Sequence, residues 1–159
     1  IENKLKFSPY VGEAVVFGDS RPFVTVMIAI DPTTVGKWAE RQRIAYTSFQ
    51  DLSTRPEVRD LIREEIRRCN AGLPAATQIR RFIVLNKEFD ADDDEITRTR
   101  KIRRRFVAQK YAVVIDGLYD GVPEVDIEAC RAIAEDRLQV RFRVREYRPN
   151  GHPLNGCSQ

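Results

Sequence analysis

Two apolar runs rich in β-branched residues, joined by a short polar link, place the strongest limit on how this chain can fold. Residues 13–18 and 23–30 each favour an extended strand, and residues 19–22 between them have the polar, turn-forming character of a hairpin loop. The sequence therefore predicts an antiparallel pair of strands near its start, on which the rest of a small domain can pack.

Two amphipathic helices are expected after this hairpin. Val35, Trp38 and Ala39 recur at helical spacing behind residues 31–34, whose hydroxyl groups can cap a helix. We expect Trp38 to fill the core rather than to hold a ligand. The second helix has the clearer signal, because its apolar positions fall on one stripe. These positions are Val58, Leu61, Ile62, Ile66 and Cys69.

The second helix also has a predicted start and a charged face. Thr54 and Glu57 match a capping box, with Pro56 in the first turn. The face opposite the apolar stripe carries Arg59, Arg63, Glu64, Arg67 and Arg68. Such a face is usually solvated, and we expect these charges to lie in water.

A third strand, an acidic turn and a further helix follow. Residues 79–85 favour a strand, and apolar positions between Ile102 and Leu118 predict one amphipathic helix. Residues 90–95 are acidic and turn-prone, but they lack the glycine and the distal glutamate of an EF-hand loop. We therefore expect a solvated turn there rather than a calcium site.

Alternating apolar and polar residues near the C-terminus predict a second antiparallel pair, formed by residues 125–130 and 138–145. The expected fold class is α+β: a small antiparallel or mixed sheet flanked by helices, with an additional C-terminal β-hairpin. We expect residues 1–121 to form the main unit, residues 122–147 its hairpin extension, and residues 148–159 a flexible tail.

Composition narrows the class of protein. The 159 residues are 42% hydrophobic and 32% charged, which is typical of soluble globular domains. No stretch approaches the roughly 20 apolar residues of a membrane-spanning helix, and residues 1–4 have no targeting character, so a cytoplasmic location is predicted. The opening at Ile1 favours an excised fragment.

The residues that usually build redox and metal sites are sparse. Cys69, Cys130 and Cys157 are widely spaced and form no C-x-x-C pair, so we expect reduced structural thiols and no zinc site. His152 is the only histidine and lies in a segment rich in proline, glycine and asparagine. No histidine-based catalytic triad and no metal ligands are therefore expected.

A concentration of cations at residues 95–106 is the most unusual feature of the sequence. These charges come just before and within the first turns of a predicted helix, where the helix dipole repels cations. An anionic partner is the simplest compensation, and phosphate groups fit the fork of arginine and the compact charge of lysine. Taken alone, the cluster is equally compatible with solvated charge.

Three short blocks occur in order along the chain: residues 1–10, residues 13–18, and the pattern Ile96-Thr-x-Thr-x-Lys-x-x-Arg104. Together they resemble the C-terminal domain of long-chain fatty-acid CoA ligases, which belong to the adenylate-forming superfamily. The resemblance covers roughly residues 1–119, and three blocks at fitting separations are more specific than any one of them.

The resemblance implies a small mobile lid that serves two half-reactions of a larger enzyme. The first joins a fatty carboxylate to AMP and expels pyrophosphate, and the second lets the thiol of coenzyme A displace AMP. By this resemblance Lys101 takes the place of the adenylation lysine. Arg103 and Arg104 are candidates either to contact phosphates of coenzyme A or to pair with the partner domain. Thr97 and Thr99 match a turn that shapes the loop.

Two residues depart from the family pattern. Arg98 stands where long-chain members often have proline, and Arg100 stands where smaller acyl ligases have glycine before the lysine. If the motif is aligned one residue earlier, Arg100 occupies the position of the adenylation lysine instead of Lys101. The hinge residue and the glycine-rich loop of the family would precede Ile1, so neither is assigned.

The resemblance also implies cofactors and partners. ATP, Mg²⁺ and coenzyme A would serve the complete enzyme, with none bound tightly by this fragment, which alone is expected to be inactive. The partners would be an N-terminal AMP-binding domain and a fatty acid. Peripheral association with a membrane surface and a homodimer stay open, and no nucleic acid is expected.

Two other functions are open at this point. The basic segment and the arginine-rich helix face could form a nucleic-acid-binding module, against which stand the net charge of only +3 and the lack of a base-stacking signature. The domain could also be a non-catalytic interaction module that self-associates through an edge of its C-terminal hairpin.

Overall fold

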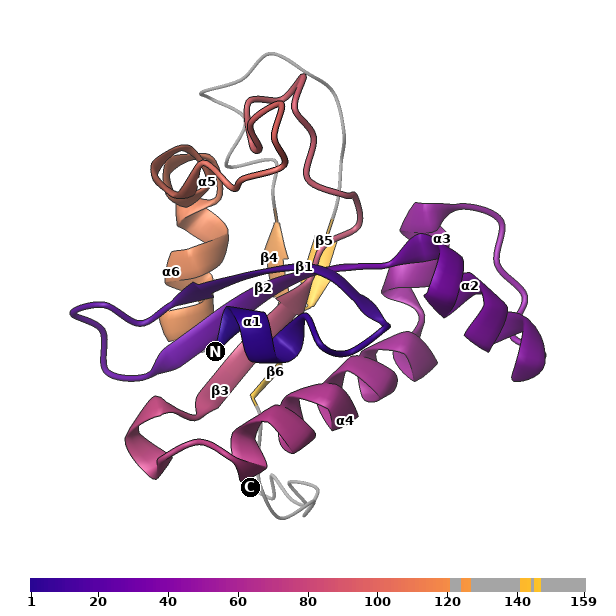
Figure 1. Ribbon diagram of the computed structural model, residues 1–159, viewed down its shortest axis with the longest axis horizontal. Helices are drawn as coiled ribbons and strands as arrows, with labels where there is room; N and C mark the ends of the chain where they lie inside the picture. Colours follow the sequence, from indigo (N-terminus) through magenta and orange to yellow (C-terminus); the bar gives the residue numbers. More distant parts are fainter. Residues whose placement is uncertain (121–123, 127–140, 144, 147–159) are drawn as a thin grey trace, which may run out of the picture.

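The computed structural model describes residues 1–120, 124–126, 141–143 and 145–146 (Figure 1). The helices are α1 (Glu2–Leu5), α2 (Pro32–Arg41), α3 (Phe49–Thr54), α4 (Pro56–Ala71), α5 (Arg104–Lys110) and α6 (Ala112–Asp120), with a 3₁₀ turn at Ala75–Thr77. The strands are β1 (Val11–Phe17), β2 (Val24–Ile30), β3 (Ile79–Val84), β4 (Glu124–Asp126), β5 (Arg141–Arg143) and β6 (Arg145–Glu146).

The main sheet is mixed, and its strand order is β1-β2-β3-β6. The first two strands form the predicted antiparallel pair, which begins two residues earlier than expected because Val11 pairs with Ile30. Strand β3 then lies parallel to β2, since α2, α3 and α4 carry the chain back to the start of the sheet. The predicted α+β class, with a small mixed sheet flanked by helices, is confirmed.

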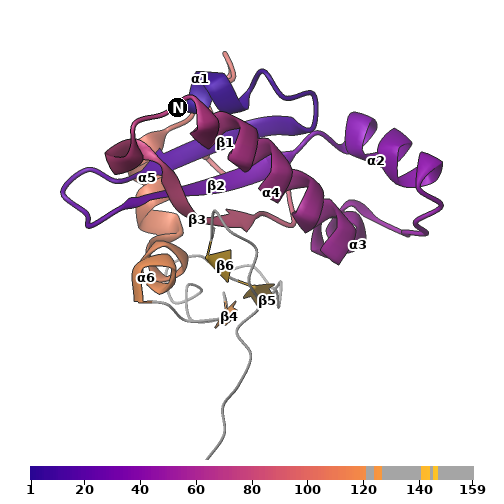
Figure 2. The same cartoon turned by 90° about the horizontal axis from the view of Figure 1, so that it is seen from below.

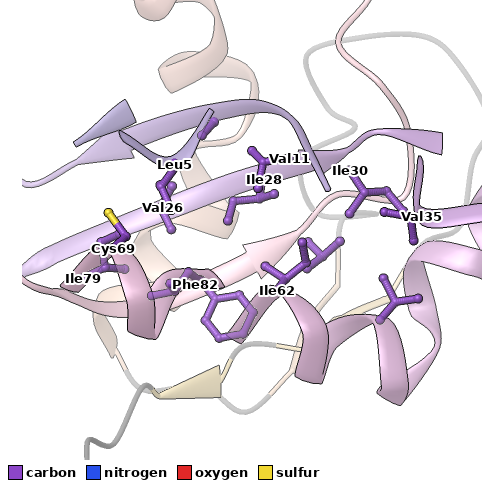
Figure 3. Packing of buried hydrophobic residues seen from close by; sticks show 14 of the residues in the cluster. Leu5, Val11, Val26, Ile28, Ile30, Val35, Ile62, Cys69, Ile79 and Phe82 are labelled. Carbon is purple, nitrogen blue, oxygen red and sulfur yellow. The ribbon is translucent and has the colours of Figure 1, made fainter. Parts of the chain in front are cut away.

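Alternation along the strands gives the sheet two buried faces. On β2, Val26, Ile28 and Ile30 point into one core with α1, α2, α3 and α4 (Figure 3). Met27 and Ala29 point into the other core, which α5 and α6 cover. In Figures 1 and 2, α2 and α3 stand at the end of the sheet away from α6.

The cap of α2 differs from the expectation, because the carboxylate of Asp31, not a threonine hydroxyl, accepts the backbone N–H of Thr34 at 2.7 Å. Trp38 is half-buried against the first core, as predicted.

The capping box predicted at Thr54 and Glu57 is wrong. Ser48 caps α3 by accepting the N–H of Asp51 at 3.1 Å, so the chain is already helical when it reaches Thr54. Arg55 then takes an extended conformation, with φ −60° and ψ 134°, because a residue before proline is disfavoured in the helical region. Helix α4 therefore starts at Pro56 without a side-chain cap.

The apolar stripe of α4 is confirmed, although Leu61 is only half-buried. The stripe also includes two polar residues that the pattern does not mark, Glu65 and Asn70, both buried. Asn70 joins α4 to β3, because its side chain donates to the carbonyl of Ile79 and accepts from the same residue's N–H, each at 2.9 Å.

The single helix predicted between Ile102 and Leu118 is two helices in the structure. Helix α5 ends at Lys110, and Tyr111 leaves the helical conformation with φ −104° and ψ 19° before α6 begins. Tyr111 is buried at this break, and its hydroxyl donates to the carboxylate of Glu95.

The C-terminal segments pair in part as predicted. Strands β4 and β5 are antiparallel, with Val125 opposite Phe142. Strand β6, expected as part of the same hairpin, instead pairs with β3 and extends the main sheet (Figure 2). Cys130, His152, Cys157 and the predicted tail at 148–159 lie outside the described residues. Within the described part of the chain, no helix is long and apolar enough to cross a membrane.

Candidate functional site

The basic segment forms a closed loop that stands above the sheet, in the salmon-red part of Figure 1. Ile96 and Ile102 form an antiparallel bridge, and the N–H of Thr97 donates to the carbonyl of Lys101 at 2.8 Å. At the base of the loop, the N–H of Arg103 donates to the carbonyl of Glu95 at 2.9 Å. We call residues 95–103 the basic loop.

The tip of the basic loop is held by its own hydrogen bonds. The N–H of Arg100 donates to the carbonyl of Thr97 at 2.8 Å, and the N–H of Lys101 donates to the Thr97 hydroxyl at 3.0 Å. The hydroxyls of Thr97 and Thr99 share a further bond of 2.9 Å. The threonines therefore bond within the turn, and Arg100 completes it in the left-handed region, with φ 58°.

Lys101 is exposed at this tip. Among the described residues its side chain has no hydrogen-bond or ion-pair partner, and its exposed neighbours Arg98 and Arg100 have none either. The tip thus presents cationic side chains to solvent on a backbone that is fixed by hydrogen bonds.

Arg103 and Arg104 differ from Lys101 because both have partners within the domain. Arg103 pairs with Asp94, and its guanidinium carbon lies 5.7 Å from the centroid of the Phe106 ring. Arg104 pairs with Glu2 and donates to the carbonyl of Val16 at 3.3 Å. Both remain exposed, but the structure does not gather their charges with that of Lys101 at the tip.

Glu95 is the residue of this region that the sequence analysis missed. It was assigned to a solvated turn, whereas its side chain is fully buried. It accepts hydrogen bonds from the Tyr111 hydroxyl at 2.7 Å and from the Asp90 N–H at 3.1 Å. The ammonium groups of Lys110 and Lys87 lie 2.9 and 3.1 Å from the same carboxylate.

A second carboxylate, that of Asp93, closes this cluster on its solvent side. Its pKa is lowered, first by the hydrogen bond from Lys87, against which burial acts, and further by the charge of Lys110. Burial acts to lower the pKa of Lys87, but the hydrogen bonds and charges of Asp93 and Glu95 outweigh it and raise that pKa. The acidic turn is thus bound to lysines of the domain.

The arginine-rich face of α4 is exposed or half-buried, and much of it is paired along the helix. Arg63 pairs with Asp60 at 2.6 Å, and Arg68 pairs with Glu65 at 2.8 Å. Arg67 and Glu64 form a further pair at 2.6 Å. Because each pair joins opposite charges, this face is not a continuous cationic surface.

The comparison with protein families identifies the domain. Residues 1–123 match the family described as AMP-binding enzyme C-terminal domain. The chain is 35% identical over 121 residues to the long-chain-fatty-acid–CoA ligase FadD15 of Mycobacterium tuberculosis, covering 76% of this chain and 20% of the ligase. It is 30% identical over 123 residues to long chain acyl-CoA synthetase 1 of Arabidopsis thaliana, covering 75% of this chain and 18% of that protein.

Solved structures share the fold. The adenylation domain of a carboxylate reductase from Mycobacterium chelonae superposes with a TM-score of 0.57 at 20% identity, covering 75% of this chain and 17% of that chain. The A-PCP didomain of carboxylic acid reductase from Segniliparus rugosus, in complex with AMP, gives 0.56 at 17% identity, covering 76% and 15%. The chain spans about a fifth of the length of the curated relatives it matches. It belongs to the family of AMP-binding enzyme C-terminal domains, and its relatives include long-chain fatty-acid CoA ligases.

Proposed function

We propose that this domain is the C-terminal lid of a long-chain fatty-acid CoA ligase, and that Lys101 is its adenylation lysine. The observation that carries the proposal is the state of Lys101: an exposed ammonium, without a partner among the described residues, on a loop fixed by hydrogen bonds. A cation held in this way can enter the active site of a neighbouring domain without first breaking an ion pair of its own.

The chemistry asked of Lys101 is electrostatic. Negative charge moves among the oxygens of the α-phosphate and the carboxylate as the acyl-adenylate forms and pyrophosphate leaves. A positioned ammonium that meets this charge lowers the barrier more than it strengthens binding of the ground state. The fixed backbone of Thr97 and Lys101 favours this role, because little reorganisation is then needed at the moment of reaction.

The backbone supports Lys101 rather than Arg100 as this residue. Arg100 has a φ of 58°, a conformation that glycine adopts without steric cost and other residues adopt rarely. By the resemblance, Arg100 stands where smaller acyl ligases have glycine just before the lysine, and its left-handed conformation fits that position. This fit supports the alignment in which Lys101 is the adenylation lysine.

The remaining parts of the proposal concern the complete enzyme. ATP, Mg²⁺ and coenzyme A would be substrates or cofactors of the whole ligase, together with a fatty acid and an AMP-binding domain. The described residues contain no group of three acids, histidines or cysteines suited to hold a metal ion, and the proposal assigns Mg²⁺ to none of them. A cytoplasmic location at or near a membrane surface belongs to the same proposal.

Arg103 and Arg104 have a secondary role in the proposed function. Each would have to exchange an intradomain partner, Asp94 or Glu2, for a phosphate of coenzyme A. Because exposed ion pairs typically contribute only about 0–1 kcal/mol, such an exchange costs little free energy. We propose these arginines as contacts in the second half-reaction only, after the lid has turned.

The test is a hybrid ligase in which this chain replaces the matching C-terminal fifth of FadD15. With palmitate, ATP, Mg²⁺ and coenzyme A, we expect AMP release from the hybrid and none from this chain alone. A hybrid that is folded but inactive contradicts the proposed function. Turnover by the chain alone contradicts the expectation that it needs an AMP-binding domain.

A matched pair of variants distinguishes a specific role of Lys101 from an effect of the total positive charge at the tip of the basic loop. Lys101→Ala should abolish most pyrophosphate release by the hybrid, whereas Arg98→Ala, three residues away on the same exposed tip, should leave it near the unmodified level. Equal losses in both variants would show that the tip acts only through its summed charge.

A further inference from the structure

The N–H, the carbonyl and the carboxylate of Glu95 each have a hydrogen-bond or ion-pair partner. Its N–H donates to the carbonyl of Asp90 at 3.0 Å, and its carbonyl accepts the N–H of Arg103 at 2.9 Å. Its carboxylate accepts hydrogen bonds from the Tyr111 hydroxyl and the N–H of Asp90, and it forms ion pairs with Lys110 and Lys87. One residue therefore joins the acidic turn, the closing bond of the basic loop and the junction between α5 and α6.

The position of Glu95 determines what this network can control. The basic loop leaves the body of the domain at Glu95 and returns at Arg103, and Lys101 lies two residues before that return. Within the loop, the hydrogen bonds of Thr97 fix the tip to itself but not to the domain. The direction in which Lys101 points is therefore determined at the base, where Glu95 is held by its polar partners and Ile96 and Ile102 pack against the second core.

Stability alone does not explain a fully buried carboxylate at this place. Removing charges from water is costly, and apolar side chains of similar volume often stabilise a core as well as a buried ion pair does. The partners of Glu95 come from separate elements, with Lys87 just after β3, Lys110 ending α5, and Tyr111 between α5 and α6. Such a network is suited to fixing one arrangement of these elements rather than to adding strength.

We propose that Glu95 is the positioning residue of Lys101: its buried carboxylate fixes the base of the basic loop so that the lysine ammonium is presented at one angle to the adenylating site. This inference rests on the proposed function of Lys101 and adds to it a residue that never touches the substrate. Tyr111 and Lys110 are the parts of the domain against which the loop is held.

The first test measures the two half-reactions of the hybrid ligase separately. Glu95→Gln keeps the shape of the side chain and removes its charge, and it should lower kcat for pyrophosphate release on the order of 100-fold, the effect of misplacing a reacting group by about 1 Å. The KM for ATP and the rate of thioester formation from supplied palmitoyl-adenylate should change little. Glu88→Gln, the same substitution at an exposed residue seven positions earlier, is the matched control.

The second test follows the loop in this chain alone. Amide hydrogen exchange at Lys101 and Arg103, whose N–H groups are hydrogen-bonded, should speed up in Glu95→Gln and stay unchanged in Glu88→Gln. Amides in β2, which exchange through global unfolding, should speed up by no more than the measured loss of stability, and by less than the amides of the basic loop. If Glu95→Gln fails to fold, Tyr111→Phe removes one donor to the carboxylate and should show the same pattern to a smaller degree.

The outcomes separate this inference from the function on which it rests. If Lys101→Ala loses pyrophosphate release while Glu95→Gln and Tyr111→Phe retain it, the positioning role is wrong and the function of Lys101 stands. If Lys101→Ala retains pyrophosphate release, the proposed function itself fails. Equal loss of both half-reactions in Glu95→Gln, with exchange in the basic loop and in β2 accelerated by the same factor, would show a general structural role and overturn the inference.

Discussion

The hydroxyl of Tyr111 lies 2.7 Å from the carboxylate of Glu95, and this hydrogen bond joins the junction between two helices to the base of the basic loop. Both side chains are buried, so neither group has water as an alternative partner. Removal of the hydroxyl would therefore leave the buried carboxylate short of one donor.

Tyr111→Phe should therefore destabilise the domain. A hydrogen bond to a charged group contributes about 1.5–3 kcal/mol, and we expect a loss of this size in the free energy of unfolding. Urea denaturation followed by circular dichroism measures it. The control is Tyr10→Phe, because the Tyr10 hydroxyl has no hydrogen bond within the described part of the chain. Equal stabilities of the two variants would contradict the role given to this contact.

Arg81 fastens the end of α6 to the sheet. Its guanidinium donates to the carbonyls of Leu118 at 2.7 Å and Tyr119 at 3.3 Å, and it lies 5.1 Å from the centroid of the Phe23 ring. Arg81→Met should lower the free energy of unfolding by about 1–3 kcal/mol, because these carbonyls lose a charged donor. Arg80→Met, one residue earlier and exposed, should change it by less than about 0.5 kcal/mol.

Asn70 makes a comparable bond in the first core. Asn70→Ala leaves both the N–H and the carbonyl of Ile79 without their partner, and each unsatisfied buried group costs about 1–3 kcal/mol. Thermal and urea unfolding should both show the loss. Asn3→Ala, at an exposed asparagine, provides the comparison, and a similar small effect at both positions would refute the proposed bridge between α4 and β3.

How much of the fold and of the candidate site the sequence predicts depends on how far apart in the chain the interacting residues lie. Strands β1, β2 and β3 and the stripe of α4 were predicted because alternation and helical periodicity are local signals. The start of α4 was misread because Thr54 matches a capping box locally, while Ser48, six residues earlier, had already begun the preceding helix. A pattern of four residues cannot show which of two overlapping helices it belongs to.

Glu95 was missed for a different reason. It lies in a run of acids that has the composition of a solvated turn, and nothing within that run marks one member as buried. Its partners Lys87 and Lys110 stand eight residues before and fifteen after it, and only the packing of α5 against the sheet brings them together. Lys101, by contrast, could be proposed from the sequence because its surroundings form a compact sequence motif.

The pair of Lys87 and Asp93 should make stability depend on pH in two windows. Asp93 has a pKa below its ordinary value of 3.8, so its contribution is complete above that value and is lost as pH falls through the lowered pKa. Lys87 has a pKa above its ordinary value of 10.5, so its contribution is complete below that value and is lost as pH rises through the raised pKa.

Asp93→Asn tests the acidic window. The difference in unfolding free energy between the unmodified domain and this variant should be largest above about pH 5 and shrink as pH falls toward about 2. Asp92→Asn is the matched control, since this exposed neighbour shows no ion pair in the described residues. A difference for Asp93→Asn that stays constant with pH would contradict the pairing.

The central claim is that Lys101 serves the formation of the acyl-adenylate and not the thioester step. The most direct measurement compares both half-reactions of the hybrid ligase with and without Lys101→Ala. Removal of one preorganised donor predicts pyrophosphate release about 100- to 1000-fold slower, with thioester formation from supplied palmitoyl-adenylate within a few-fold of the unmodified rate. Unchanged pyrophosphate release, or equal losses in the two steps, would contradict the account.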